Sequence, residues 1–228
     1  MLFFRALFLG IVVDHSVNID HVRDVARISD AKEKLMEAAL DLIWERSYGA
    51  TSVDDICSQA GVKKGSFYYF FKSKSDLEIA ALEANWSESR RRLNEIFSPT
   101  VPPLERFEQL FDFVACKQAK LQEECGCILG CPLFTIGSEV STREAGIREK
   151  VQAILNSYAQ FFESAIRDAH AQGLIVAQDA KLKSKVLFAY FQGTLTQARI
   201  ENNIELLRGL KEGAFALLGV KRHEPASA

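Results

Sequence analysis

The chain has 228 residues, of which 48% are hydrophobic and 25% charged, and this composition excludes collagen-like, disordered and polytopic membrane proteins. Its 28 Lys and Arg residues against 30 Asp and Glu residues give a net charge of −2, which argues against a protein that coats nucleic acid along its whole surface. The 13 glycines and 5 prolines are few for this length and favour long regular elements.

The N-terminal segment, residues 1–29, is expected to form an extension outside the fold. Its apolar start, Met1 to Val13, is too short to span a bilayer, and it lacks the lysine-rich start and small-residue cleavage pattern of a secretory signal. We therefore expect no membrane contact, although an export signal or anchor remains the alternative. The fold is predicted from Asp30 onward.

Between Asp30 and the first proline cluster, the apolar pattern predicts helices. Asp30 with Glu33, and Ser75 with Glu78, have the spacing of capping boxes, in which the two side chains satisfy backbone donors of the first helical turn. Gly61 should end a helix, because glycine adopts the left-handed conformation at little cost. We expect helices over residues 30–49, 51–61, 64–70 and 75–97.

A cluster of three prolines, Pro99, Pro102 and Pro103, interrupts this series. Beyond it, apolar residues recur at helical spacing, and no alternating strand pattern of useful length occurs. We expect helices from about residue 104, then a short one, then helices over 141–173, 179–200 and 202–218. The sequence therefore predicts an all-α fold.

The stretch from Thr51 to Lys74 has the pattern of a helix-turn-helix, with two short helices joined by a tight glycine turn behind a supporting helix. From Ile56 to Ser75 there are four lysines and no acid, so a local basic patch lies in a nearly neutral chain. Serine and tyrosine hydroxyls in this patch can bind phosphate or base edges, and Gly65 lets the backbone approach DNA. The candidate contacts are Lys63, Lys64, Gly65, Ser66, Tyr68, Tyr69, Lys72 and Lys74. The alternative is a solvated lysine cluster beside buried aromatic residues, Phe67 and Phe71.

This stretch resembles the TetR family of bacterial transcriptional repressors, over about residues 31–82. The resemblance is carried by the tripeptides 60–62 (AGV), 64–66 (KGS) and 67–69 (FYY) and by the tetrapeptide 71–74 (FKSK). It implies a three-helix DNA-binding domain over residues 30–76 and a double-stranded DNA operator as partner. It also implies that Thr51 and Ser52 contact phosphate, that residues 64–69 lie on the recognition helix and that Lys74 clamps the DNA backbone. Phe70 departs from the family, which often has histidine or tyrosine there.

For the rest of the chain, the resemblance implies a helical ligand-binding and dimerisation domain over residues 77–220, followed by a tail over 221–228. The last two long helices would form the interface of a homodimer. The implied function is that of a ligand-responsive repressor, released from a palindromic operator by a small, partly apolar effector, with no cofactor. The aromatic residues expected to bind the effector are Trp86, Phe107, Phe111, Phe134, Tyr158 and Phe162. Packing in the core is the alternative for each of them.

Four of the five cysteines cluster between residues 116 and 131. Their odd total and lack of a disulfide-scaffold spacing indicate a reducing, cytoplasmic setting. Cys116, Cys125, Cys127 and Cys131 are candidates for a thiol sensor of oxidants or electrophiles, which is the alternative function; cysteines without a role are a further alternative. The one-residue gap and the absence of a nearby histidine disfavour a metal site.

An enzyme is disfavoured, because no His–Cys pairing, carboxylate pair or phosphate loop occurs.

Overall fold

The computed structural model describes residues 19–220, with side chains from Asp30 onward, and this part of the chain forms ten helices and no strand. The predicted tail and the first 18 residues of the predicted extension lie outside the described residues. In chain order the helices are α1 (Ile19–Glu45), α2 (Val53–Ala60), α3 (Lys64–Phe70), α4 (Lys74–Ile96), α5 (Pro103–Cys125), α6 (Pro132–Val140), α7 (Ala145–Ala171), α8 (Ala180–Glu201), α9 (Glu205–Arg208) and α10 (Leu210–Leu218). The all-α prediction is confirmed.

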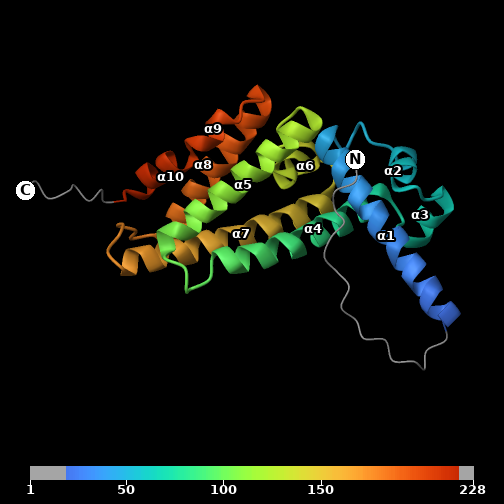
Figure 1. The fold of residues 1–228 in the computed structure, drawn as a ribbon, viewed down its shortest axis with the longest axis horizontal. Coiled ribbons are helices and arrows are strands. Elements are labelled where there is room, and N and C mark those ends of the chain that lie inside the picture. Colours follow the sequence, from blue (N-terminus) through green and yellow to red (C-terminus); the bar gives the residue numbers. More distant parts are fainter. Residues whose placement is uncertain (1–18, 221–228) are drawn as a thin grey trace, which may run out of the picture.

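The helices form an elongated molecule, with α1, α2 and α3 at one end and α4 to α10 along the rest (Figure 1). Helix α7 packs against α4, α5 and α8, while α1 packs against α2, α3, α4 and α6. Helix α1 therefore contacts both the end helices, α2 and α3, and the adjacent body of the molecule. No helix in the described part of the chain combines the length and apolar character needed to cross a bilayer.

Two clusters of buried side chains hold this arrangement together. The small core lies under α1 to α3 and consists of Leu35, Ala38, Ala39, Leu42, Ile56, Cys57, Phe67, Phe71 and Leu77. The large core fills the body from α4 to α10. Helices α1 and α4 contribute to both, because Leu42 belongs to the small core and Ile43 to the large one, and Leu77 and Leu82 divide in the same way. The two cores are thus joined by rigid helices rather than by a linker.

The first helix differs from the prediction at both of its ends. It begins at Ile19, and Asp30 lies inside it, where its carboxylate accepts a hydrogen bond from Lys34 at 2.5 Å. The predicted start at Asp30 is therefore wrong, because the preceding residues continue the helix and an i,i+4 ion pair replaces the cap. The helix ends at Glu45, ahead of Gly49, whose N–H donates to the Glu139 carboxylate at 2.7 Å.

Three other predicted helix starts also move. Helix α4 is capped by Ser73, which accepts from the Asp76 N–H at 3.0 Å, rather than by Ser75. Helix α7 begins at Ala145, after the predicted start at residue 141. Asn202 takes the left-handed conformation, with φ +49°, and ends α8 instead of beginning the last helix. By contrast, the predicted end of α2 at Gly61 and the predicted start of α8 at Asp179 are confirmed.

Candidate nucleic-acid interface

Helix α2 is fixed at its first turn by a capping box. The Ser52 hydroxyl accepts from the Asp55 N–H at 3.1 Å, and the Asp55 carboxylate accepts from the Ser52 N–H at 2.8 Å. Hydrogen bonds that the Asp55 carboxylate accepts from the Ser52 hydroxyl, at 2.6 Å, and from the Ser52 N–H lower the pKa of Asp55. Gly61 ends the helix with φ +65°. Helix α2 is therefore well defined at both ends despite its eight residues.

Helix α3 is held to the small core by one face and presents the other to solvent. Phe67 is completely buried and Phe71 nearly so, with ring centroids 6.0 Å apart. Tyr68 and Tyr69 point the other way, with 57% and 73% of their surface exposed. A Cβ placed on the exposed Gly65 would meet nothing within 4 Å. Large exposed aromatic side chains beside an open backbone are typical of a binding surface.

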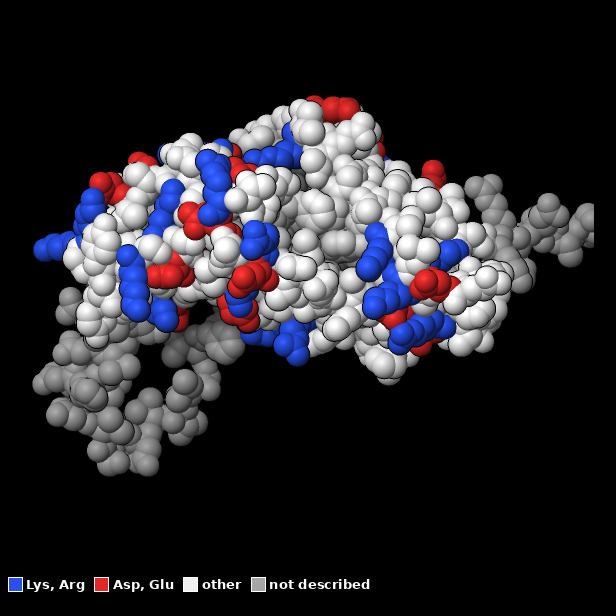
Figure 2. All heavy atoms as spheres, turned by 180° about the vertical axis from the view of Figure 1, so that it is seen from behind, with Lys and Arg blue, Asp and Glu red and all other residues white. Residues whose placement is uncertain are grey.

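The predicted basic patch is present around α3. Lys63, Lys64 and Lys72 are exposed, and Figure 2 shows basic side chains mixed with acidic ones at this end of the molecule. Lys64 forms an ion pair with Asp54 at 2.8 Å, and the hydrogen bond to Asp54 raises the pKa of Lys64. Because both side chains are exposed, this pair is weak and can open in favour of a phosphate.

Thr51 and Lys74 both bind the loop between α1 and α2. The buried Thr51 hydroxyl donates to the Ser47 carbonyl at 2.8 Å. The Lys74 ammonium donates to the carbonyls of Tyr48 and Thr51 at 2.7 and 2.8 Å and lies 4.0 Å from the centre of the Tyr48 ring. Burial lowers the pKa of Lys74. The loop between α1 and α2 thus uses the Thr51 hydroxyl and two of the three donors of the Lys74 ammonium, which disfavours the phosphate contacts predicted for these residues.

The loop between α1 and α2 is bound by the body of the molecule as well. The Glu139 carboxylate, on α6, accepts from the N–H groups of Tyr48 and Gly49 at 2.8 and 2.7 Å. Glu78, on α4, is completely buried, and neither carboxylate oxygen has a hydrogen-bond partner. Burial raises the pKa of Glu78 to about 7, while Lys74 acts in the opposite direction. No local sequence pattern pointed to this junction, because its partners lie far apart in the chain.

A second junction joins the end of α1 to the loop after α5. The Trp44 indole N–H donates to the Leu129 carbonyl at 2.7 Å. The Arg199 guanidinium, from α8, donates to the same carbonyl at 2.6 Å and to the Trp44 carbonyl at 3.0 Å. The end of the molecule that carries α2 and α3 is therefore joined to the body at two separate places. No local sequence pattern predicted a role for Trp44 or Arg199.

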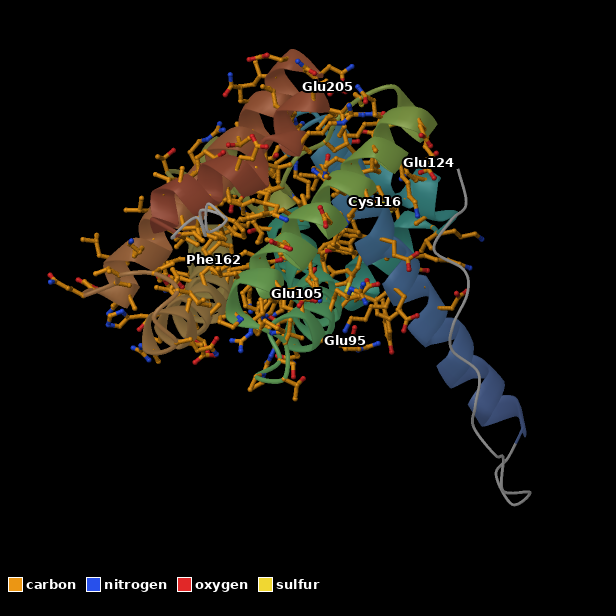
Figure 3. All side chains as sticks on the ribbon, turned by 60° about the vertical axis from the view of Figure 1, so that its left-hand side comes forward. Glu95, Glu105, Cys116, Glu124, Phe162 and Glu205 are labelled. Atoms are coloured by element: carbon orange, nitrogen blue, oxygen red, sulfur yellow. The ribbon has the colours of Figure 1, made fainter. Side chains whose placement is uncertain are left out.

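All six aromatic residues predicted to bind an effector pack in or against the large core. Trp86 packs against Tyr158 with the ring centroids 4.9 Å apart, and Phe107 meets Phe162, which is labelled in Figure 3, at 5.3 Å. Phe111 is buried beside Phe107. Ligand binding among these rings would require helices to part, because the side chains already fill the space.

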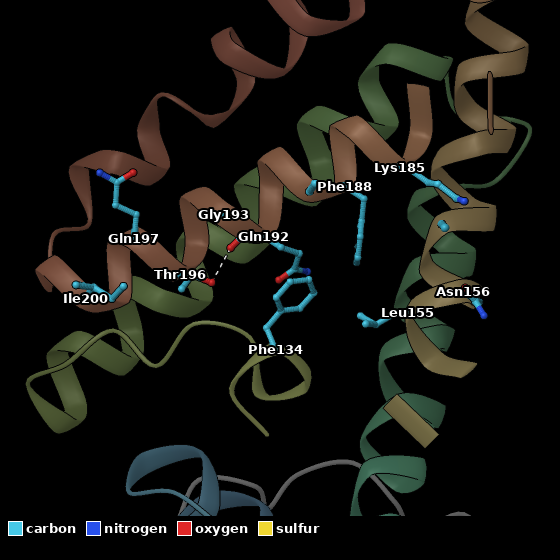
Figure 4. Close-up of a pocket in the computed structure, with 12 residues that line it drawn as sticks. Phe134, Leu155, Asn156, Lys185, Phe188, Gln192, Gly193, Thr196, Gln197 and Ile200 are labelled. Atoms are coloured by element: carbon cyan, nitrogen blue, oxygen red, sulfur yellow. Dashed lines mark hydrogen bonds between the residues drawn. The ribbon is translucent and has the colours of Figure 1, made fainter. Parts of the chain in front are cut away.

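A hollow of about 550 Å³ lies between α6, α7 and α8 (Figure 4). Phe134 is the member of the predicted set that lines it. The other lining residues are Leu155, Asn156, Ala159, Lys185, Phe188, Ala189, Gln192, Gly193, Thr196, Gln197 and Ile200. The side-chain oxygen of Gln192, one of these residues, is buried and has no hydrogen-bond partner. The volume is suited to a small molecule.

The structure brings together two of the four predicted sensor cysteines. The sulfur atoms of Cys125 and Cys127 are 3.5 Å apart, and Cys125 is exposed. Cys116 is exposed elsewhere on α5, and Cys131 packs against the large core, where burial raises the pKa of its thiol. Across the described residues, no group of three or more His, Cys, Asp or Glu side chains is arranged to hold a metal ion.

Models of known protein families match both the N-terminal and the C-terminal part of the chain. Residues 35–81 match the model of bacterial regulatory proteins of the tetR family, and residues 103–212 match the tetracyclin repressor-like C-terminal domain. The chain belongs to the TetR family. It is therefore a ligand-responsive transcription regulator with a helix-turn-helix DNA-binding domain.

Individual relatives of this TetR-family chain are distant. The repressor DhaR of Mycobacterium sp. (strain GP1) is 27% identical over 77% of this chain and 86% of its own length. A regulatory protein TetR from Rhodobacter sphaeroides has the same fold, with a TM-score of 0.74 at 24% identity over 82% of this chain and 98% of that one. The structure of FadR from Bacillus subtilis in complex with stearoyl-CoA has a TM-score of 0.64 at 19% identity over 83% and 99% of the two chains.

Proposed function

We propose that this TetR-family regulator is a homodimeric, cytoplasmic repressor that binds a palindromic operator through α3 and the start of α2. The observation that carries the proposal is the geometry of α3, where buried Phe67 leaves Tyr68 and Tyr69 exposed above an open backbone at Gly65. The contacts we assign to DNA are Ser52, Lys63, Lys64, Gly65, Ser66, Tyr68, Tyr69 and Lys72. Hydroxyl groups and lysines in this pattern can bind phosphates and base edges.

The proposed dimer uses α8 and α10. Leu182, Val186 and Ile200 on α8 and Leu217 on α10 are large apolar side chains with 43% to 78% of their surface exposed. A second copy of the chain would cover them, and a twofold dimer suits a palindromic operator. Other apolar residues of these helices, such as Leu210, are already buried within the chain. A monomer in light scattering at micromolar concentration would contradict this part of the proposal.

The proposed effector site is the hollow beside α8. A partly apolar ligand would pack on Phe134, Leu155 and Phe188, and a hydroxyl or amide N–H of the ligand would donate to the free oxygen of Gln192. The FadR structure with stearoyl-CoA has the same fold, which supports an effector with a long apolar part. Because Glu139 on α6 holds the loop between α1 and α2, movement of α6 offers a route from the hollow to the DNA-binding helices.

The test is a pair of titrations with an operator selected from a random pool of duplexes. The first measures operator affinity of the reduced protein by fluorescence anisotropy, with the Tyr68→Ala, Tyr69→Ala double variant as the negative control. The second measures the affinity of a fatty acid or acyl thioester with and without operator. By linkage, an effector that releases the protein must bind more weakly when operator is present, by the same factor by which it weakens operator binding. Equal ligand affinity in both titrations would contradict release by that ligand.

A further inference from the structure

Two thiols meet at the end of α5. Cys125 is the last residue of the helix and is exposed, and its sulfur lies 3.5 Å from that of Cys127. Gly126 between them has φ +77°, and a Cβ there would meet nothing within 4 Å. A disulfide needs the sulfur atoms at about 2.05 Å, so the pair has to close by a small movement of the loop. A glycine between the two cysteines allows this movement at little conformational cost.

The loop that follows, residues 126–130, is held by hydrogen bonds to two helices. Asn202, at the end of α8, donates to the Gly126 carbonyl at 3.0 Å and accepts from the Ile128 N–H at 3.0 Å. Gln118, buried in α5, accepts from the N–H groups of Leu129 and Gly130 at 3.1 and 2.9 Å. A displacement of residue 127 is therefore passed along the segment instead of being absorbed by a free loop.

This segment ends on the DNA-binding part of the molecule. The Leu129 carbonyl, two residues after Cys127, accepts from the Trp44 indole at 2.7 Å and from Arg199 at 2.6 Å. Trp44 lies near the end of α1, which packs against both α2 and α3. The thiol pair is thus one short segment away from the helix that supports the DNA-binding surface.

We propose that Cys125 and Cys127 form a reversible disulfide on exposure to a hydroperoxide, and that this bond weakens operator binding through residues 126–130 and Trp44. This inference rests on the proposed function, since it adds a thiol trigger to the same DNA-binding regulator. It selects two of the four cysteines in the cluster, and it assigns no role to Cys116 or Cys131.

The chemistry needs only the two thiols and the peroxide. The thiolate of exposed Cys125 attacks the O–O bond of the hydroperoxide, which leaves as an alcohol, and Cys125 becomes a sulfenic acid. The sulfur of Cys127 then displaces water from that sulfenic acid, and the S–S bond forms. Two thiols lose two protons and two electrons, and the peroxide is reduced to alcohol and water. Burial and the neighbouring Cys125 raise the pKa of Cys127, which favours Cys125 for the first step. A dithiol reductant reverses the bond.

The test compares the reduced protein with protein treated with a small excess of hydrogen peroxide. We expect the intact mass to fall by two hydrogen atoms, with Cys125 and Cys127 linked in the peptide map, and the operator Kd to rise about tenfold. Dithiothreitol should restore both. Cys125→Ser and Cys127→Ser should each abolish the response while leaving operator affinity in the reduced state unchanged. Cys116→Ser is the matched control, because it removes an exposed thiol from the same helix and should respond like wild type (Figure 3).

The route through α1 is tested with Trp44→Phe, which keeps an aromatic ring but loses the N–H to Leu129. This variant should still form the disulfide, and its operator affinity should respond less to oxidation. Oxygen addition without a disulfide, a response abolished by Cys116→Ser, or a disulfide that leaves operator affinity unchanged would each overturn the switch. A reduced wild-type protein without operator affinity would instead overturn the proposed function.

Discussion

Nine buried residues from α1 to α4 form the small core, whereas the large core joins buried side chains from α1 and from α4 to α10. The small core contains two phenylalanines and no tryptophan, while aromatic rings form a connected network through the large one, from Phe97 and Phe107 through Phe162 to Phe188 and Phe191. The small core thus has few contacts with which to hold α3. The large core distributes its packing over many helices.

The largest effect is expected for Phe67→Ala, a change in the small core. Truncating a fully buried phenylalanine costs about 3–5 kcal/mol, and in the small core this loss should release α3 as a unit. Phe162→Ala, in the large core, should lower global stability by a similar amount and leave α3 protected. Amide hydrogen exchange of α3, alongside urea unfolding, distinguishes the two variants. Equal loss of α3 protection in both would show that the cores unfold together.

The next largest effect is expected from Glu78, which lies completely buried at the junction of the two cores. Its pKa is raised to about 7 from 4.5, so the native state binds a proton more tightly than the unfolded state. The free energy of unfolding should therefore fall as the pH rises from about 4.5 to about 7, by about 3 kcal/mol, and then level off. Urea unfolding at several pH values measures this slope.

A matched pair of variants isolates the contribution of Glu78. Glu78→Gln should abolish the slope and make the protein more stable than wild type at pH 8. Glu83→Gln removes an exposed carboxylate from the same helix and should keep the slope. An unchanged pH dependence in Glu78→Gln would show that this carboxyl group is not the group responsible.

Lys72 and Lys74 lie two residues apart, but we expect Lys74 to stabilise the fold and Lys72 to bind DNA phosphate. Lys74→Ala removes two hydrogen bonds to the loop between α1 and α2, so stability should fall by about 1–2 kcal/mol with little change in the salt dependence of operator binding. Lys72→Ala should leave stability unchanged and lower the slope of log K against log salt by about one unit. Anisotropy titrations at several salt concentrations would reveal the opposite assignment if Lys74 contacts phosphate.

The smallest effect is expected for Tyr68→Phe. This change removes one hydroxyl from a side chain that is 57% exposed, so the stability of the small core should not change. Operator binding should weaken by about 0.5–1.5 kcal/mol, the contribution of one hydrogen bond. Tyr158→Phe, in the large core, is the control and should leave operator affinity unchanged. A loss of stability in Tyr68→Phe would mean that the hydroxyl serves the fold.

Much of the DNA-binding domain could be predicted because its determinants are local. Ser52 and Asp55 are three residues apart, and Gly61 alone determines where α2 ends. Phe67 and Phe71 lie one helical turn apart, so helix periodicity was enough to place both in the core. Local patterns failed where another local interaction competed. Asp30 with Glu33 has the spacing of a capping box, but an uninterrupted helix from Ile19 leaves no N-terminus there to cap.

The sequence by itself determined the helices, the turn between α2 and α3, and the identity of the exposed residues on α3, since these depend on residues within one or two helical turns. Some polar side chains can donate to any of several carbonyls, and only the tertiary structure decided which carbonyl each of them binds. The Lys74 ammonium binds carbonyls at positions 48 and 51, and the Trp44 indole binds a carbonyl at position 129. A lysine or tryptophan side chain carries no preference for one distant carbonyl over another. The packing of α4 and α6 against α1 contributes to that choice, because it helps determine which acceptor lies within hydrogen-bond distance.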